Sequence, residues 1–273
     1  MDDAKRRAQT TYNAAAECFD EPALGFWDRF GRATVDRLTL QPGATVLDAC
    51  AGSGASAVPA AERVGPSGKV VAVDLADNLL RLARAKADRV GVRHLETRQG
   101  DIEALDYAPG SFDAVIIVFG LFFLPDMTAA TRALWRLVAP GGQLAVTTWG
   151  PRLFEPANSA FWDAVDRVRP DLTRAYNPWD SLTEPSALAA VLAEAGAKGA
   201  DVESVPGSHP LRGPEDFWTI VQGSGYRATY DAMSADERDA VRARCMGAIS
   251  DRRVTTIETN VVYATARKRL AAR

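Results

Sequence analysis

Residues 46–57 read VLDACAGSGASA, and this stretch decides the fold. A short apolar strand ends in an acid, Asp48, and runs at once into a turn of small residues with the spacing GxGxxA, in which Gly52 and Gly54 are the glycines. A glycine turn between a strand and a helix lets the backbone approach a ligand closely, and the start of the helix offers unpaired N–H groups. Asp48 would repel a pyrophosphate at this place. The stretch therefore predicts a ligand with a positively charged end.

Strands and helices alternate on either side of this turn. Apolar runs such as KVVAVD (69–74) and FDAVIIVF (112–119) lack a polar face, which is typical of parallel strands covered on both sides. An α/β fold follows, with a mostly parallel sheet and helices on both faces. The expected strands are 44–49, 69–74, 93–98, 112–119 and 143–149, and the expected helices are 55–64, 77–89 and 127–138. GPSG (65–68) and APGG (139–142) are expected to be turns.

The remaining segments complete one domain, 1–273. Apolar residues at helical spacing predict a helix over 22–40, and a further helix (184–197), an adjacent strand (200–210), two or three helical pieces (214–250) and a long final strand (255–268) follow. The expected parts of the domain are an N-terminal helical cap (1–40), a ligand-binding core (41–150), helical insertions (151–183 and 210–252) and segments that complete the sheet (184–209 and 253–268).

The amino-acid composition excludes several classes of function. The 273 residues include 32 basic and 35 acidic ones, for a formal charge of −3, so no strong positive field is available to gather nucleic acid. The N-terminus lacks the apolar core of a signal peptide, and the longest apolar run (114–124) is too short for a bilayer, so we expect a cytoplasmic protein without a membrane span. Three scattered cysteines and two histidines predict reduced thiols and no metal site. A small molecule is the expected partner. Monomer and homodimer remain open.

Five segments in order carry a family resemblance. VLDACAGSG (46–54) resembles the first motif of the class I S-adenosylmethionine-dependent methyltransferases, and VVAVDLADNLL (70–80) and GDIEALDYAPGSFDAV (100–115) resemble the second and third. FDAVIIVFGLFFLPDM and LWRLVAPGGQLAVTTW resemble the strand and the helix-turn-strand that follow. The resemblance covers residues 44–149. It implies a Rossmann-like sheet of seven mostly parallel strands with a reversed last strand, and S-adenosyl-L-methionine as cofactor, whose cationic end suits Asp48.

The resemblance also implies the cofactor site. Asp74 would accept from the two ribose hydroxyls, Asp101 from the adenine amino group, and Ile102 would pack on the adenine ring. Asp74 could instead be the N-cap of the helix that follows it, and Asp101 could instead cap the turn that follows it. The expected cofactor-binding residues are Tyr12, Asp48, Ala51, Gly52, Ser53, Gly54, Asp74, Leu75, Leu79, Gly100, Asp101, Ile102 and Phe119.

The sequence departs from the family pattern in two places. Cys50 stands where the motif usually has its first glycine, and because a positive φ strains a residue with a side chain, we expect an ordinary backbone angle there. FGLFFLPD (119–126) stands where relatives often carry polar or histidine residues, which removes an obvious general base from that wall.

Aromatic residues predict an acceptor pocket at the carboxyl edge of the sheet, where ligands of such folds bind. Trp27, Phe122, Phe123, Trp149 and Phe154 are its expected lining. TYNAAAECFDEP (11–22) resembles the cap that closes over the cofactor in the ubiquinone/menaquinone-type and natural-product branches of the family, with Tyr12 as a lid residue. His209 is the candidate catalytic base for a hydroxyl acceptor, and a plain surface histidine is the alternative.

These features predict methyl transfer to a small hydrophobic organic molecule at an oxygen, nitrogen or carbon atom, mainly by in-line positioning. One alternative is an NAD(P)-dependent oxidoreductase, which the GxGxxA spacing favours and Asp48 and Asp101 oppose. A non-catalytic S-adenosylmethionine-binding subunit is another. The lack of a basic patch and of an Asn/Asp-Pro-Pro-aromatic signature argues against methylation of nucleic-acid bases.

Overall fold

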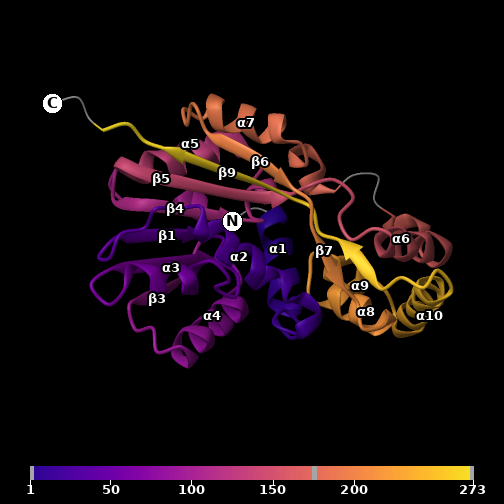
Figure 1. The fold of residues 1–273 in the computed structure, drawn as a ribbon. Helices are drawn as coiled ribbons and strands as arrows, with labels where there is room; N and C mark the ends of the chain where they lie inside the picture. Colours follow the sequence, from indigo (N-terminus) through magenta and orange to yellow (C-terminus); the bar gives the residue numbers. More distant parts are fainter. Residues whose placement is uncertain (1–2, 174–176, 271–273) are drawn as a thin grey trace.

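The computed structural model describes residues 3–173 and 177–270, so residues 174–176 of the expected insertion and the first two residues of the expected cap lie outside the described part. Its centre is a seven-stranded sheet in the order β3-β2-β1-β4-β5-β9-β6 (Figure 1). The five strands from β3 to β5 run parallel, whereas β9 is antiparallel to both of its neighbours. The strands are β1 (Thr45–Ala49), β2 (Lys69–Asp74), β3 (Leu95–Gln99), β4 (Phe112–Val118), β5 (Val138–Trp149), β6 (Asp201–Val205) and β9 (Val261–Arg267). The predicted fold class and its reversed last strand are confirmed.

Helices cover both faces of this sheet, as the apolar strands predict. Side chains alternate between the two faces of a strand, so neighbouring residues of β1 enter different cores. Leu47 packs in one core with Leu134 of α5. Val46 packs in the other core with Val35 of α2 and Val64 of α3. The helices around the sheet are α2 (Phe26–Asp36), α3 (Ala57–Val64), α4 (Asp77–Arg89), α5 (Met127–Leu137) and α7 (Pro185–Glu194).

Several element boundaries differ from the predictions. The helix expected over 22–40 is a 3₁₀ turn, η1 (Pro22–Leu24), followed by the shorter α2. The expected turn APGG (139–142) lies inside β5, which begins at Val138. The expected final strand is broken after β8 (Thr256–Glu258), which pairs with β7 (Ser208–Pro210) in a separate two-stranded sheet. The strand is interrupted at Asn260. The Oδ1 of Asn260 accepts a hydrogen bond from the N–H of Gly207, and its backbone carbonyl accepts one from the N–H of Gly150.

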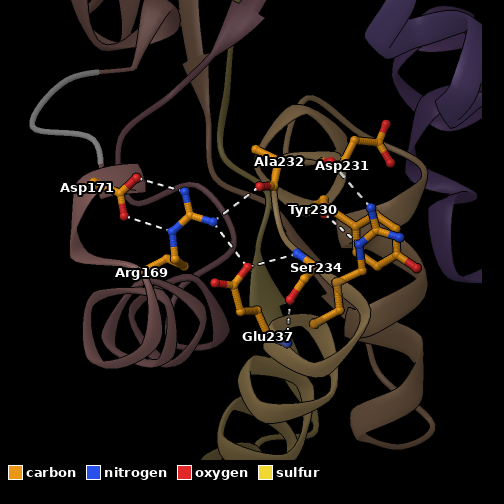
Figure 2. A network of polar contacts seen from close by, with 8 residues as sticks. Arg169, Asp171, Tyr230, Asp231, Ala232, Ser234 and Glu237 are labelled. Atoms are coloured by element: carbon orange, nitrogen blue, oxygen red, sulfur yellow. Dashed lines mark hydrogen bonds and ion pairs between the residues drawn. The ribbon is translucent and has the colours of Figure 1, made fainter.

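A group of helices stands beside the sheet and comes from two separate segments of the chain (Figure 1). Arg169, just beyond the end of α6, ties the two segments together: it donates to both carboxylate oxygens of Asp171, to the carbonyl of Ala232 and to Glu237 (Figure 2). Glu237 also completes the capping box at the start of α10 with Ser234. The elements of this group are α6 (Ala157–Val168), η4 (Pro170–Leu172), α8 (Pro214–Gln222), α9 (Arg227–Asp231) and α10 (Ala235–Asp251). The short helix η5 (Pro178–Leu182) lies instead against α7, β5 and the turn η3 (Leu121–Phe123).

The N-terminal segment forms a helix, α1 (Asp3–Ala15), which packs against α4 and α9. Polar contacts hold it against the loop after β2 and the start of α4. Gln9 donates to the carbonyl of Leu75, and Asn13 and Asn78 exchange two hydrogen bonds. None of the helices within the described residues combines the length and the apolar character that a bilayer span requires.

Candidate active site

A cavity of about 1040 Å³, its open mouth included, lies at the carboxyl edge of the sheet, where a doubly wound fold binds its ligands. α1 contributes one wall, and the loops after β1, β2, β3 and β4 contribute the others. We refer to it as the cofactor cavity. It brings together all of the predicted cofactor-binding residues except Asp48 and Gly54. These are Tyr12, Ala51, Gly52, Ser53, Asp74, Leu75, Leu79, Gly100, Asp101, Ile102 and Phe119.

The two glycines of the turn have different tasks. Gly52 has a φ of +52° and donates its N–H to Oδ2 of Asp74 at 2.8 Å, so the turn is bonded to the end of β2. Gly54 has a φ of +82°, and a Cβ there would stand 2.9 Å from the Cβ of Ala83 on α4. Gly54 therefore lets the turn pack against α4 and does not itself line the cavity.

Asp74 lies at the end of β2 and lines the cofactor cavity. Its Oδ1 accepts from the N–H of Ala76 and its Oδ2 from that of Gly52, both at 2.8 Å. The N-cap of α4 is Ala76, so Asp74 is not the cap of that helix. Burial raises the pKa of Asp74, and three backbone hydrogen bonds oppose that rise. Each carboxylate oxygen can accept a second hydrogen bond, so Asp74 retains capacity for a diol.

Asp48 is completely buried beneath the turn and does not line the cavity. Its Oδ2 accepts from the hydroxyl of Ser56 at 2.7 Å, and its Oδ1 has no hydrogen-bond partner among the described residues. Burial raises the pKa of Asp48 to about 7, the negative Asp74 adds to the rise, and the Ser56 hydroxyl opposes it. Asp48 therefore has no direct contact with the space of the cavity.

The expectation of an ordinary angle at Cys50 was wrong, because its φ is +60°. The turn requires this angle although the residue has a side chain. Gly120, after β4, leaves the space that the side chain occupies: a Cβ on Gly120 would stand 2.5 Å from the Cβ of Cys50. Burial raises the pKa of the Cys50 thiol well above 9.0, and the carboxylates of Asp74 and Asp48 add to the effect. Cys50 is therefore a neutral thiol on the cavity wall.

Asp101 both lines the cofactor cavity and caps the short turn η2 (Ile102–Ala104), where its Oδ1 accepts from the N–H of Glu103. Its Oδ2 also pairs with Lys5 of α1 at 2.6 Å, and Lys5 pairs with Glu103 as well. Sequence reasoning missed this part of α1. The signal was the spacing i, i+3, i+4, i+7 of Lys5, Ala8, Gln9 and Tyr12, which all line the cavity.

A second cavity of about 330 Å³, its open mouth included, adjoins the first, and we refer to it as the aromatic cavity. All five residues predicted for the acceptor pocket line it: Trp27, Phe122, Phe123, Trp149 and Phe154. Phe119 stacks on Trp149 with 3.9 Å between ring centroids and an interplanar angle of 17°. Four residues line both cavities, namely Tyr12, Trp27, Phe119 and Phe123. The two cavities therefore share one wall.

Further residues of the aromatic cavity come from η5 and from the helical group, which local sequence patterns did not connect to the site. They are Trp179, Ser224, Gly225 and Tyr226. The hydroxyl of Tyr226 donates to Oδ1 of Asn158 at 2.6 Å. Within the described lining, the ionisable side chains are the phenols of Tyr12 and Tyr226. No cluster of three or more His, Cys, Asp or Glu side chains suited to a metal ion occurs in residues 3–173 and 177–270.

His209 lines neither cavity. It lies on β7, where its ring meets the ring of Phe26 edge to face at 5.1 Å between centroids. Burial lowers the pKa of His209, and the positive charge of Arg29 adds to the effect. The imidazole is therefore neutral at pH 7 and packs behind the wall of the site.

Known proteins resemble this chain over different lengths. The ubiquinone/menaquinone biosynthesis C-methyltransferase UbiE of Cronobacter sakazakii is 37% identical over 136 residues, 50% of this chain and 53% of that protein. The nocamycin O-methyltransferase of Saccharothrix syringae is 29% identical over 251 residues, 85% of this chain and 87% of that protein. The chain thus matches about half the length of the UbiE relative.

The fold is also that of solved methyltransferase structures. The phosphoethanolamine N-methyltransferase 2 of Haemonchus contortus, solved in complex with S-adenosyl-L-methionine, superposes with a TM-score of 0.61 at 17% identity, over 98% of this chain and 60% of that chain. The model of the ubiE/COQ5 methyltransferase family matches residues 12–176. The chain therefore belongs to the ubiE/COQ5 methyltransferase family, and S-adenosyl-L-methionine is its cofactor.

Proposed function

We propose that this protein transfers a methyl group from S-adenosyl-L-methionine to a small hydrophobic organic molecule bound in the aromatic cavity. The observation that carries the proposal is the wall shared by the two cavities, made of Tyr12, Trp27, Phe119 and Phe123. A molecule in the aromatic cavity meets the cofactor cavity at this wall. Aromatic walls favour an apolar or planar acceptor, because they offer contact area and few hydrogen bonds.

The residues of the cofactor cavity fit a nucleoside with a cationic end. Asp74 has acceptor capacity for the ribose diol, and Asp101 and Ile102 lie on the same cavity for the adenine ring. The unpaired Oδ1 of the buried Asp48 adds negative charge beneath the turn whenever its carboxyl is ionised. These carboxyl groups disfavour a pyrophosphate. This is the physical reason to prefer the sulfonium cofactor to NAD(P).

When bound, the cofactor supplies a methyl group on a positively charged sulfur. The rest of the cofactor leaves as a neutral thioether, which is a good leaving group. The chain then has to align the acceptor and exclude water, and the buried rings of Phe119 and Trp149 serve both needs. His209 has no part in this proposal, because it lines neither cavity. The proposal covers an oxygen, nitrogen or carbon nucleophile.

Two measurements test the function. Calorimetry with S-adenosyl-L-methionine and, separately, with NADPH should give binding of the first alone, whereas tight uptake of NADPH would contradict the assignment. The purified chain is then incubated with methyl-labelled cofactor and a panel of apolar phenols, hydroquinones, enols and amines. Label in an apolar product supports the transferase. Cofactor binding without any transfer across the panel supports the alternative of a non-catalytic binding subunit.

A further inference from the structure

We propose that Lys86 is a positioning residue for the amino-acid end of the cofactor. It lies in the third turn of α4, and only 12% of its side chain is exposed. Its ammonium group contacts three oxygens: Oδ1 of Asp20 at 2.8 Å, Oδ1 of Asp28 at 2.7 Å and the hydroxyl of Ser53 at 3.0 Å. A lysine has three N–H donors, so these three contacts use all of them. The inference rests on the proposed use of S-adenosyl-L-methionine.

The two carboxylates belong to segments that build the cavity wall. Asp20 directly follows Phe19, and Asp28 directly follows Trp27. Phe19 and Trp27 stack with 5.1 Å between centroids and an interplanar angle of 4°, and both line the cofactor cavity. One ammonium group therefore holds the segments that carry both stacked rings.

The third partner, Ser53, belongs to the glycine turn. It is 1% exposed and lines the cofactor cavity. The turn also packs on the same helix as Lys86, since Gly54 lies against Ala83 of α4. Lys86 thus bonds both to the turn and to the segments that carry the Phe19–Trp27 stack.

The order of the strands shows which end of the cofactor this clamp serves. Asp101 follows β3 and Asp74 ends β2, so the proposed adenine and ribose contacts lie at these two strands. The sheet continues from β2 to β1 and β4. The remaining part of the cofactor, its amino acid and sulfonium, therefore extends over the end of β1, where the turn begins.

The test compares two ligands that share adenosine and differ in the amino-acid end, which S-adenosylhomocysteine has and 5′-methylthioadenosine lacks. Calorimetry measures both dissociation constants for the full chain and for Lys86→Met. We expect Lys86→Met to bind S-adenosylhomocysteine about tenfold more weakly, because the turn and the Phe19–Trp27 stack are no longer held in place beside the amino-acid end. The same variant should bind 5′-methylthioadenosine within about twofold of the unchanged chain. Lys86→Arg keeps a cation and should restore most of the difference.

Arg81→Met is the matched control, because Arg81 lies on the same helix in an exposed pair with Asp77 and should leave both constants unchanged. A merely structural Lys86 would lower the melting temperature and weaken both ligands by the same factor. That result, or unchanged binding of S-adenosylhomocysteine, would overturn the inference. If Lys86→Met does not fold, Asp28→Asn removes one contact of the exposed carboxylate and should shift the ratio of the two constants in the same direction. An unchanged chain that binds neither ligand would overturn the proposed function as well.

Discussion

At the scale of single residues, the acids of the cleft are distinguished by what they contact. Asp74 accepts two backbone N–H groups and lines the cavity, whereas Asp48 is enclosed beneath the turn with one oxygen unpaired. Both carboxyl groups have raised pKa values because both are buried. Their positions nevertheless differ, because Asp74 faces the cavity and Asp48 does not. In the proposed function, Asp74 offers a direct hydrogen bond and Asp48 only a buried charge.

Replacing Asp74 tests the direct hydrogen bonds. Asp74→Ala should weaken the binding of S-adenosylhomocysteine by about 1 to 3 kcal/mol, because charge-assisted hydrogen bonds to the ribose would be lost. Calorimetry measures the effect. Asp77→Ala is the control, since Asp77 pairs with Arg81 and Arg84 on α4 and does not line the cavity. Equal affinities of Asp74→Ala and the unchanged chain would remove Asp74 from the site.

Replacing Asp48 tests the buried charge through pH. The pKa of Asp48 is raised from 3.8 to about 7 in the folded chain, so the folded state holds a proton that the unfolded state releases between these values. The contribution of Asp48 to stability therefore falls as the pH rises from about 4 to about 7, by at most about 4 kcal/mol. Asp48→Asn cannot ionise.

The melting temperature of Asp48→Asn, measured relative to the unchanged chain, should therefore increase from pH 4.5 to pH 8. The comparison between the two proteins cancels the titration of all other groups that the substitution leaves undisturbed. A difference that stays constant over this range would show that Asp48 does not titrate there.

At the scale of elements, the glycine turn and α4 depend on each other. Gly54 combines a positive φ with contact to Ala83, whereas Gly65, at the other end of α3, has a positive φ of +66° and open space around it. Gly65→Ala should lose about 1 to 3 kcal/mol of unfolding free energy from the backbone alone, and Gly54→Ala should lose about 1 to 3 kcal/mol more than Gly65→Ala from the steric clash. Chemical denaturation measures both. Equal losses would contradict the close packing of the turn on α4.

The elements that local patterns determine were predicted well. The limits of α4 matched the prediction, and α3 and α5 came within two residues of it, because apolar spacing and glycine stops are local signals. The broken last strand was not predicted, since it depends on the bonds of Asn260 to Gly207 and Gly150, which are distant in sequence. The expected helical cap (1–40) had no separate helix with bounds of its own over residues 3–15, because this segment is largely polar and has little apolar periodicity.

In the site, too, the features that depend on residues distant in the sequence were not predicted. Motifs identified the residues that follow the strands, such as Gly52, Asp74 and Asp101, because the ends of parallel strands meet at one edge. The positive φ of Cys50 was mispredicted because the space left by Gly120, seventy residues later, is a tertiary feature. Ser224 and Tyr226 reach the aromatic cavity from the helical group, and no local pattern connects them to it.

At the scale of the whole molecule, the N-terminal helix and the helical group meet over the site. Arg227 of α9 donates to the carbonyl of Ala14, 213 residues earlier, and also pairs with Glu17. The phenol oxygen of Tyr12 lies close to Gly225, where a Cβ would be 3.4 Å away. The two cavities are therefore covered jointly by the beginning of the chain and by a late segment.

Breaking this contact should loosen α1. Arg227→Met removes the donor to Ala14, so hydrogen exchange of the α1 amides should become about tenfold faster, the change expected for about 1.4 kcal/mol of local stability. Mass spectrometry measures the exchange. Arg238→Met is the control, because Arg238 bonds to the carbonyls of Tyr230 and Asp231 within the helical group. Equal protection of α1 in both variants would show that Arg227 does not hold it.

The wall common to the two cavities has a consequence for inhibitor chemistry. Tyr12, Trp27, Phe119 and Phe123 separate an adenosine-sized space from an aromatic one by the thickness of one layer of side chains. An adenosine joined by a short tether to a flat hydrocarbon would place its second half at a high effective concentration once its first half was seated. Tether length would then act as a ruler, and the best-binding compound would report how far apart the donor and acceptor stand.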